Sequence, residues 1–300
     1  MTLPLKYIYL LCGISKQAHA QALVREKLVA DKRNLYIGLM HQIRELHPGM
    51  GLRKMYNQFQ PEGVGRDAFI AIGMEEGLRL QVNRNPTRTT WSSKRYGYPN
   101  LLENLELTNV NQVWSSDITY FSIAGKHYYI VLIMDIYSRK LVGYSVADHM
   151  KAANNIAALQ SALNLRGVDD YQKQLIHHSD RGSQYISEDY TQLLVEFGIR
   201  ISMCGDVLEN AHIERVNGTI KNEYLRYWQI QNLKELKKCL KKAVLNYNNR
   251  SHNALNGDTP NDFEVRLRAI PQNQRRKMKI YTQKMNSINN TNQLDLFKSV

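Results

Sequence analysis

Three acidic residues, far apart in the chain, have the surroundings of a metal site. Asp117 lies in the apolar and aromatic stretch 114–120, which is typical of a central strand. Asp180 follows a short apolar run, and ligands bind at the carboxyl edge of such strands in open α/β sheets. Glu214 lies on a predicted helix. Three carboxylates without thiolates suit Mg²⁺ or Mn²⁺. Two such ions, about 4 Å apart, support in-line displacement at phosphorus. We therefore predict that Asp117, Asp180 and Glu214 are catalytic and bind the metal.

The helix that carries Glu214 has an apolar stripe and a polar ridge beside it. The stripe contains Ile213, Val216 and Ile220 at helical spacing. If this stripe packs on a sheet, the ridge overhangs the sheet edge, and Lys221 extends outward to a phosphate. The ridge consists of Asn210, Glu214, Asn217 and Lys221. We predict that its amides and its lysine bind DNA, together with Arg181 beside Asp180.

Other chemistries fit these residues less well. Ser179 and Asp180 follow two histidines, but no nucleophile elbow is present and the histidines adjoin the serine along one strand. A zinc site would have to gather scattered side chains without any CxxC or HxxxH pair. Its ligands would be His177, His178, Cys204 and His212. Taken singly, each acid can equally be a surface charge or a helix cap.

The composition indicates a globular protein of about two domains. The chain has 300 residues, 43% of them hydrophobic, and no apolar run reaches the roughly 18 residues of a membrane-spanning helix. Its three cysteines are an odd number at wide spacing, which favours free thiols over disulfides. The apolar run 3–13 has neither a strong basic start nor a clean cleavage site for a signal peptide. We expect a cytoplasmic protein, associated with the nucleoid when bound to DNA, and no membrane partner.

The net charge of +13 is concentrated at the two ends of the chain. Residues 1–105 hold 15 Lys and Arg against 8 acids, residues 106–265 hold 17 against 18, and residues 266–300 hold 8 against 1. Basic flanks around a neutral centre suit a polyanion, with nucleic acid the first candidate. Solvated helix faces and a disordered tail would explain the same charges.

The pattern of apolar residues indicates an α/β core after a small helical region. Helices are expected at 20–29, 35–46 and 66–76. They are expected to form a DNA-binding region, 1–80, although an ordinary packing domain is equally compatible. The core is expected at 106–265, in the order βββαβαβα, which implies a mixed sheet with helices on its faces. Its strands are predicted at 112–122, 127–134, 140–146, 174–178 and 200–203, and its helices at 152–165, 187–197, from about 210, and 233–247.

Two further segments are basic and polar. The stretch 81–105 is predicted to be a surface linker. Its cations, interleaved with aromatic residues, are expected to follow a phosphate backbone. They are Arg84, Arg88, Lys94 and Arg95. The tail 266–300 is expected to be partly mobile.

Six or more sequence motifs in order resemble the transposases of the insertion-sequence-three family, whose catalytic subunit is similar to retroviral integrases. The resemblance spans roughly residues 40–265. The motifs are Trp114-x-x-Asp117-Ile118-Thr119-Tyr120, Asp135-x-Tyr137-Ser138-Arg139-x-x-x-Gly143, His178-Ser179-Asp180-Arg181-Gly182-Ser183-Gln184-Tyr185, Asn210-Ala211-x-x-Glu214 with Lys221 and Glu223, Tyr247-Asn248-Asn249-Arg250-x-His252-x-Ala254-Leu255, and Thr259-Pro260. Before Glu214 the chain departs from the family, because 204–211 is about two residues shorter and has Glu209 where the family has Asp.

The resemblance implies a ribonuclease-H-like core with a DDE triad at Asp117, Asp180 and Glu214. It implies a transposase that cuts at element ends and joins a 3′-hydroxyl to target DNA. It also implies a homo-oligomer on DNA, and an upstream-frame helix-turn-helix polypeptide or frameshift fusion that recognises the ends. Two alternatives remain at this point: an inactive DNA-binding copy that regulates transposition, and a plain ribonuclease-H-type nuclease.

Overall fold

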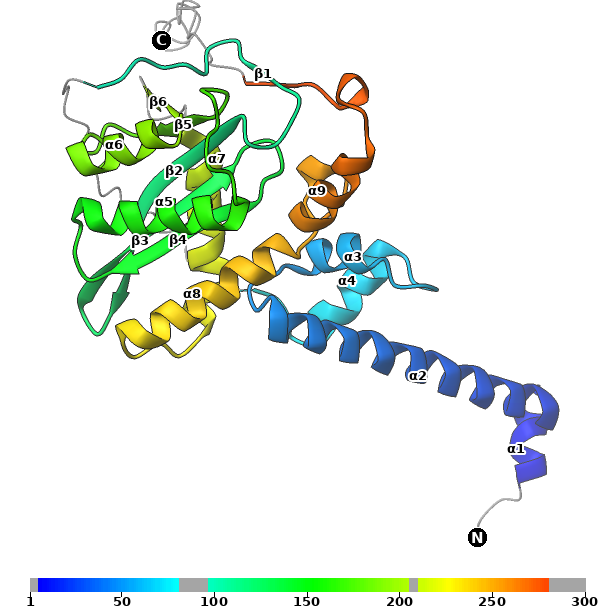
Figure 1. Cartoon of the computed structure of the whole chain (residues 1–300). Helices are drawn as coiled ribbons and strands as arrows, with labels where there is room; N and C mark the ends of the chain where they lie inside the picture. The colour runs from blue at the N-terminus through cyan, green and yellow to red at the C-terminus, as the bar shows by residue number, and fades with distance from the viewer. Residues whose placement is uncertain (1–4, 81–96, 205–209, 281–300) are drawn as a thin grey trace, which may run out of the picture. The chain divides into compact units, whose positions relative to one another are not determined.

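A computed structural model describes residues 5–80, 97–204 and 210–280 (Figure 1). Contacts within the chain divide it into two compact units, Met1–Thr87 and Arg88–Val300, which are described separately below. The four linker cations predicted to bind DNA, at positions 84, 88, 94 and 95, lie outside the described residues. Within the described ranges, no helix is long and apolar enough to cross a membrane.

The first unit is helical, with a small core around Met40, Met55 and Phe69. One expectation was wrong here, because residues 20–46 form one continuous helix instead of two short ones. The polar stretch between the two apolar runs, 30–34, contains neither Gly nor Pro and is compatible with a helix; only its apolar periodicity is missing. The helices are α1 (Leu5–Leu11), α2 (Lys16–Leu46), α3 (Leu52–Phe59) and α4 (Arg66–Glu75).

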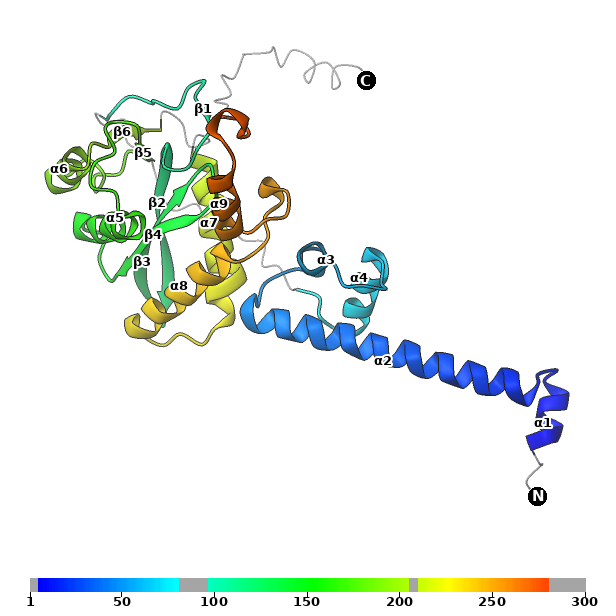
Figure 2. The ribbon, with the colours of Figure 1, turned by 45° about the vertical axis from the view of Figure 1, so that its right-hand side comes forward.

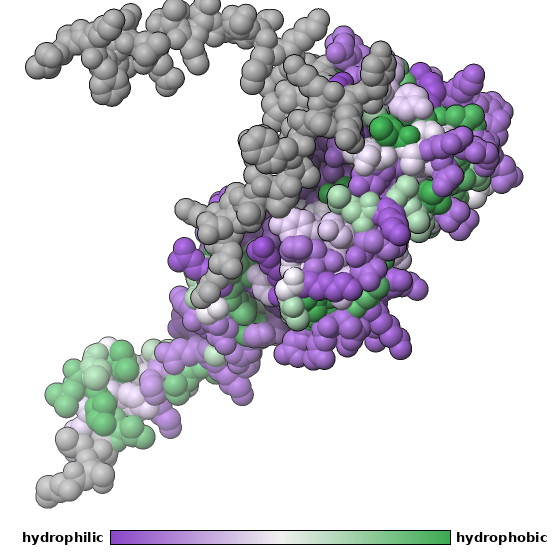
Figure 3. All heavy atoms as spheres, turned by 90° about the vertical axis from the view of Figure 1, so that its left-hand side faces the viewer, coloured by the Kyte–Doolittle hydropathy of each residue, from purple (hydrophilic) through white to green (hydrophobic). Residues whose placement is uncertain are grey.

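Apolar side chains are exposed at the start of this unit. Figure 3 shows them gathered over α1, next to the N-terminal residues drawn in grey. Leu10 and Leu11 are each 80% exposed, and α1 buries none of its side chains. The core of the unit begins only at Tyr36, in the second half of α2.

The second unit is built on a mixed five-stranded sheet in the order β4-β3-β2-β5-β6 (Figure 1). The pairs β2–β3 and β3–β4 are antiparallel, whereas β2–β5 and β5–β6 are parallel. This confirms the expected meander and the ribonuclease-H-like fold class. The strands are β2 (Val113–Ile123), β3 (Lys126–Asp135), β4 (Leu141–Ala147), β5 (Ile176–Ser179) and β6 (Arg200–Met203).

Helices cover both faces of this sheet, as Figure 2 shows. On one face, α5 (Ala152–Arg166) and α6 (Glu188–Glu196) pack over Trp114, Val131 and Ile133. On the other, α7 (Ala211–Thr219) and α8 (Leu233–Asn248) pack over alternate residues of the same strands. The turns η2 (Ile220–Tyr224) and η3 (Leu225–Tyr227) lead from α7 toward α8.

Gly143 of the predicted motif has a packing role. A Cβ atom built on it would lie 2.4 Å from the Ala158 backbone oxygen and 2.8 Å from the Ala162 Cβ. Helix α5 therefore approaches β4 as closely as it does only because position 143 carries no side chain.

The C-terminal part of the second unit is more ordered than predicted. The expected tail boundary at 266 falls inside α9 (Pro260–Ala269), which is preceded by η4 (Asn253–Leu255) and followed by η5 (Gln272–Gln274). Strand β7 (Met278–Lys279) then pairs antiparallel with β1 (Glu106–Leu107). Strand pairing by backbone hydrogen bonds does not depend on side-chain periodicity, so the sequence pattern did not reveal it.

The expected linker also ends earlier than predicted. Leu102 is 1% exposed and belongs to the same apolar cluster as Leu107 and Phe263. The Leu101 backbone N–H donates to Ser202 Oγ at 2.9 Å. Residues 101–105 therefore pack on the rest of the second unit.

Candidate active site

Asp117 lies in the middle of β2, on the side of the sheet that α7 covers. Successive side chains of a strand point to opposite faces, so Trp114 packs against α5 and α6, while Ser115 and Asp117 face α7. On that side, Asn217 Nδ2 donates to Asp117 Oδ2 at 2.7 Å. The contact holds the carboxylate against the helix that carries Glu214.

Asp180 is the first residue after β5. That strand runs parallel to β2, with His178 opposite Ser115, so the end of β5 lies beside the middle of β2. The Gly182 backbone N–H donates to Asp180 Oδ1 at 3.0 Å and fixes the carboxylate in a tight turn. A side chain at Gly182 would press on this carboxylate, since its Cβ would lie 3.0 Å from Oδ1. Burial raises the pKa of Asp180, and the Gly182 hydrogen bond opposes this effect.

Two asparagines attach α7 to the strand that carries Asp117. Asn210, at the start of the helix, accepts a hydrogen bond from Ser115 Oγ and donates to the Ser116 carbonyl oxygen at 3.1 Å. Asn217 contacts Asp117, about two turns further along. Both asparagine side chains were predicted to bind DNA, but each residue is only 4% exposed and is used within the protein. They position the helix, and with it Glu214.

The three carboxylates affect one another's ionisation. Burial, then the charge of Asp180 and to a smaller extent that of Glu214 raise the pKa of Asp117 to about 7. Burial and the charge of Asp180 also raise the pKa of Glu214. Among the described residues, no lysine, arginine or histidine forms an ion pair with any of the three. The α7 side of the sheet therefore holds a local excess of negative charge.

The donor set suits a hard divalent cation, although the side chains are not drawn together as ligands. In the described part of the chain, no three His, Cys, Asp or Glu side chains are gathered closely enough to hold a metal ion. Repulsion keeps like charges apart, while Asn217 holds Asp117 and Gly182 holds Asp180. Glu214, on the exposed side of α7, retains its rotamer freedom.

The two predicted DNA-binding cations near these acids differ. Lys221 does not extend outward as expected: its Nζ lies 5.4 Å from the centroid of the Tyr120 ring, and burial lowers its pKa. Arg181 is exposed, and its Nε donates to the Cys204 carbonyl oxygen at 2.9 Å. Arg181 thus stands next to Asp180 with most of its guanidinium open to a ligand.

Behind the acids lies a layer of hydrogen-bonded aromatic residues that the sequence analysis did not assign. The Tyr185 hydroxyl bonds Ser116 Oγ at 2.9 Å, and the Tyr190 hydroxyl bonds His177 Nε2 at 2.9 Å. The rings of Tyr185 and Tyr190 meet edge to face at 5.6 Å. The signal for this layer was the pair of serines inside an apolar strand, since buried hydroxyls require partners.

The two histidines before Asp180 belong to the core. His178 contacts Ser202 Oγ through Nδ1 at 2.9 Å and Cys204 Sγ through Nε2 at 3.1 Å. Burial lowers the pKa of His177 to about 3 and that of His178 to about 4, so both are neutral near pH 7. Neither ring is free to act as a zinc ligand or as a base for Ser179.

Comparison with known proteins identifies the family of the chain. Residues 108–206 and 197–260 each match a family model described as an integrase core domain. The chain is 32% identical to the "Insertion element IS600 uncharacterized 31 kDa protein" of Shigella sonnei, over 71% of this chain and 80% of that protein. It is 31% identical to the transposase for insertion sequence element IS629, also from Shigella sonnei, over 72% of this chain and 73% of that protein.

Two further proteins are similar over long stretches. The putative transposase InsK for IS150 of Escherichia coli K12 is 28% identical, over 82% of this chain and 87% of that protein. The catalytic core of the HTLV-2 integrase, solved in complex with magnesium, has a TM-score of 0.43 at 23% identity and covers 55% of this chain and 99% of its own.

The identities to the IS600 and IS629 proteins extend well beyond the integrase core motifs, since they cover more than two thirds of both partners. The similarity therefore includes sequence outside the integrase core. The chain belongs to the insertion-sequence transposases with an integrase core, polynucleotidyl transferases of the retroviral-integrase type that transpose and integrate DNA.

Proposed function

We propose that Asp117, Asp180 and Glu214 together hold two divalent ions, Mg²⁺ or Mn²⁺, at the point where DNA strands are cut and joined. The observation that carries this proposal is the raised pKa of Asp117 and of Glu214, each increased by the charge of Asp180, where no described cation forms an ion pair with any of the three carboxylates. A buried negative charge costs free energy unless it is paired, and a divalent ion would pair it. Integrase-type chemistry requires such a site.

Each residue near the acids then has a task. Asn217 orients the Asp117 carboxylate, Gly182 orients that of Asp180, and Asn210 fixes the start of α7 so that Glu214 overhangs the same place. Arg181 is free to contact a phosphate beside Asp180. Bound ions would lower the pKa of the attacking hydroxyl and stabilise the leaving oxygen.

The reaction class follows from the family. Attack of water on a phosphodiester at the element end breaks the bond between phosphorus and the bridging 3′-oxygen and releases a 3′-hydroxyl. In the second step this 3′-hydroxyl attacks a target phosphodiester, one bond forms for each bond broken, and the strands are joined. No side chain of the protein becomes covalently attached.

The partners of the site are element-end DNA and target DNA. Because one set of three acids acts on one strand at a time, two ends require two chains, and we propose a homo-oligomer on DNA. Arg84, Arg88, Lys94 and Arg95 remain candidates for backbone contacts on sequence grounds. An upstream-frame helix-turn-helix polypeptide or a frameshift fusion would supply recognition of the ends.

The proposal is tested with purified protein and labelled element-end DNA, scored for nicking and strand joining. We expect activity with Mg²⁺ or Mn²⁺ and none with Ca²⁺, whose larger radius and looser coordination position the two oxygens poorly. Glu214→Gln is the most informative variant, because Glu214 is the one acid that no described hydrogen bond holds. It should lose activity by about 10³-fold, the equivalent of roughly 4 kcal/mol in the transition state.

The same assay distinguishes an active transposase from an inactive copy that only regulates transposition. Retention of all three acids at one place favours an active enzyme. A protein that binds element ends tightly but neither nicks nor joins them with any divalent ion would support the inactive copy. Full activity in excess chelator, or in the Glu214→Gln protein, would overturn the assignment of the three acids.

A further inference from the structure

Helix α8 has a strongly basic exposed face. Its apolar residues pack under Val146 and Ile130 of the sheet, whereas its lysines all lie on the solvent side. The buried side chains include Leu236, Leu240, Ala243 and Val244. The lysine surface of α8 consists of Lys234, Lys237, Lys238, Lys241 and Lys242. These lysines belong to the central part of the chain, 106–265, whose net charge is close to zero, so their clustering is a property of this one surface.

This arrangement works against the stability of the helix. Lys238 has Lys234, Lys241 and Lys242 as neighbours three or four positions away, and Lys237 has Lys234 and Lys241. Each like-charge pair at this spacing destabilises a helix by a few tenths of a kcal/mol. Lys234 also lies in the first turn, where the helix dipole disfavours a positive charge.

The protein does little to offset this repulsion. In the described ranges, no carboxylate forms an ion pair with any of the five lysines. The one acid of the helix, Glu235, accepts instead from the Gln231 N–H and from Asn232 Nδ2 at the N-terminus. Lys242 lies 5.2 Å from the centroid of the Trp228 ring. A ligand with regularly spaced negative charges would remove the penalty.

We infer that the lysine surface of α8 binds the phosphate backbone of duplex DNA. Lys234 and Lys241 are seven residues apart, about 10 Å along the helix axis. Over that axial distance one strand of B-form DNA presents about three phosphates. Flexible ammonium groups on one face suit contacts that track a backbone without reading its sequence.

The surface lies away from the acids, and this determines which DNA it meets. On the same face of the sheet, α7 contacts β2 and β3, whereas α8 contacts the edge strand β4. Strand β4 is two positions from β2 in the sheet, roughly 10 Å. The lysine surface therefore holds a stretch of duplex beyond the one at the acids. This role rests on the proposed function, since it is the DNA bound for cleavage that is being held.

The test compares two double variants that each remove two positive charges from the second unit. Lys238→Gln with Lys241→Gln alters the lysine surface. Lys173→Gln with Arg200→Gln removes two exposed cations next to β5 and β6, at the opposite edge of the sheet from β4. Affinity for a short fluorescein-labelled duplex of arbitrary sequence is measured from about 50 to 200 mM NaCl, together with the Tm of each protein.

We expect the α8 variant to bind more weakly, by more than about tenfold near 100 mM salt, with a slope of log affinity against log salt that is shallower by about 1.8, or 0.9 for each lost contact. Its Tm should equal or exceed that of wild type, because repulsion within α8 is relieved. The control variant should keep the wild-type slope.

Equal slopes in the two variants would overturn the inference, since the effect would then be one of net charge alone. Loss of binding to vesicles of phosphatidylcholine and phosphatidylserine, with DNA binding unchanged, would assign the surface to lipid and also overturn it. The binding measurement needs no catalysis, so it stays decisive if the three-acid site fails its own test. Conversely, an α8 variant that still nicks DNA at low salt separates holding from chemistry.

Discussion

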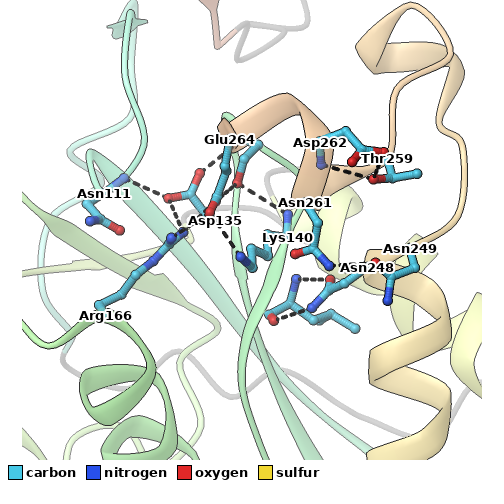
Figure 4. A network of polar contacts seen from close by, with 12 residues as sticks. Asn111, Asp135, Lys140, Arg166, Asn248, Asn249, Thr259, Asn261, Asp262 and Glu264 are labelled. Carbon is cyan, nitrogen blue, oxygen red and sulfur yellow. Dashed lines mark hydrogen bonds and ion pairs between the residues drawn. The ribbon is translucent and has the colours of Figure 1, made fainter. Parts of the chain in front are cut away.

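The second unit contains two clusters of acidic residues that the fold treats in opposite ways. In the first, Asp135 and Glu264 are surrounded by cations and hydrogen-bond donors, as Figure 4 shows. In the second, no described cation forms an ion pair with Asp117, Asp180 or Glu214, and the charge of Asp180 raises the pKa of both Asp117 and Glu214. One acid of each cluster lies on neighbouring strands of the same sheet. Asp135 of β3 is opposite Trp114 of β2, and Trp114 is three residues before Asp117.

The first cluster fastens α9 to the end of the sheet. Arg166 Nη1 and Nη2 donate to the two oxygens of Glu264, each at 2.8 Å, and Nη2 also lies 3.4 Å from Asp135 Oδ2. Lys140 Nζ and Ser138 Oγ contact the same glutamate at 3.1 and 2.7 Å. Burial alone would raise the pKa of Glu264, but Arg166 outweighs burial and the pKa is lowered.

Backbone donors add to the compensation at Asp135. Its Oδ1 accepts the N–H groups of Tyr137 and Ser138, both at 3.0 Å, and its Oδ2 accepts that of Asn111 at 2.6 Å. Burial still raises the pKa of Asp135, and Arg166 and these donors oppose that effect. Asp117 also accepts a hydrogen bond, from Asn217, so the sites differ in the cation: Arg166 pairs with Asp135 and Glu264, whereas no described cation forms an ion pair with Asp117.

The largest expected difference between the clusters is in catalysis. Asp117→Asn and Asp180→Asn should each lower nicking and strand joining by about 10³-fold or more, because each removes a proposed metal ligand while the basic surfaces stay intact. DNA affinity, measured by the same fluorescence assay, should remain within a few-fold of wild type. A variant with wild-type rates would remove its residue from the catalytic set.

A substitution in the first cluster, Asp135 and Glu264 with their cations, should lower the free energy of unfolding. Arg166→Met leaves Asp135 and Glu264 buried without their main cation, and breaking a buried ion pair from one side costs about 3–5 kcal/mol. For a unit of this size the Tm should fall by about 10 °C or more. Arg166→Lys serves as the control, since it keeps the charge but not the paired hydrogen bonds, and should lose less. Equal Tm values for Arg166→Met and wild type would contradict the role assigned to the network.

Metal should distinguish the clusters by its effect on unfolding. Saturating Mg²⁺ should raise the Tm of wild type, since a ligand at 100 times its Kd stabilises the folded state by about 2.7 kcal/mol. The increase should disappear in a protein carrying both Asp117→Asn and Glu214→Gln and persist in Arg166→Lys. Calorimetry in the presence and absence of chelator measures both. A Mg²⁺ effect that survives the double substitution would place the ion elsewhere.

The smallest expected effect concerns pH in the absence of metal. The folded pKa of Asp117, about 7, lies above the value of about 3.9 for an unperturbed Asp, so folding favours the protonated carboxyl. The resulting penalty is absent below about pH 4, grows as the pH rises toward 7 and is constant above. In chelator, Asp117→Asn should therefore have a Tm a few °C above wild type at pH 8 and nearly the same Tm at pH 4.5. A difference independent of pH would show that the Asp117 carboxylate is not the titrating group.

The sequence alone was sufficient for the order of the strands of the five-stranded sheet and of the helices α5 to α8. The apolar and aromatic residues of 113–123 and the apolar stripe of α7 each carry their signal within a few neighbouring residues, because each element must bury part of its surface. The strands of the central meander and α5 begin and end within a residue or two of the predicted positions. The α7 stripe of Ile213, Val216 and Ile220 is buried as predicted.

Only the tertiary structure decided what the polar residues around the acids do. Asn210, Asn217 and Lys221 share a helix ridge with Glu214 and looked like a DNA-binding edge, yet the asparagines bond β2 and the lysine covers Tyr120. Hydrogen-bond partners about 100 positions apart leave no local periodicity. The same reason explains β7, which pairs with a strand more than 150 residues earlier, and the bond between Arg166 and Glu264. Burial can be predicted from neighbouring residues, whereas the pairing of polar groups is settled only when distant segments meet.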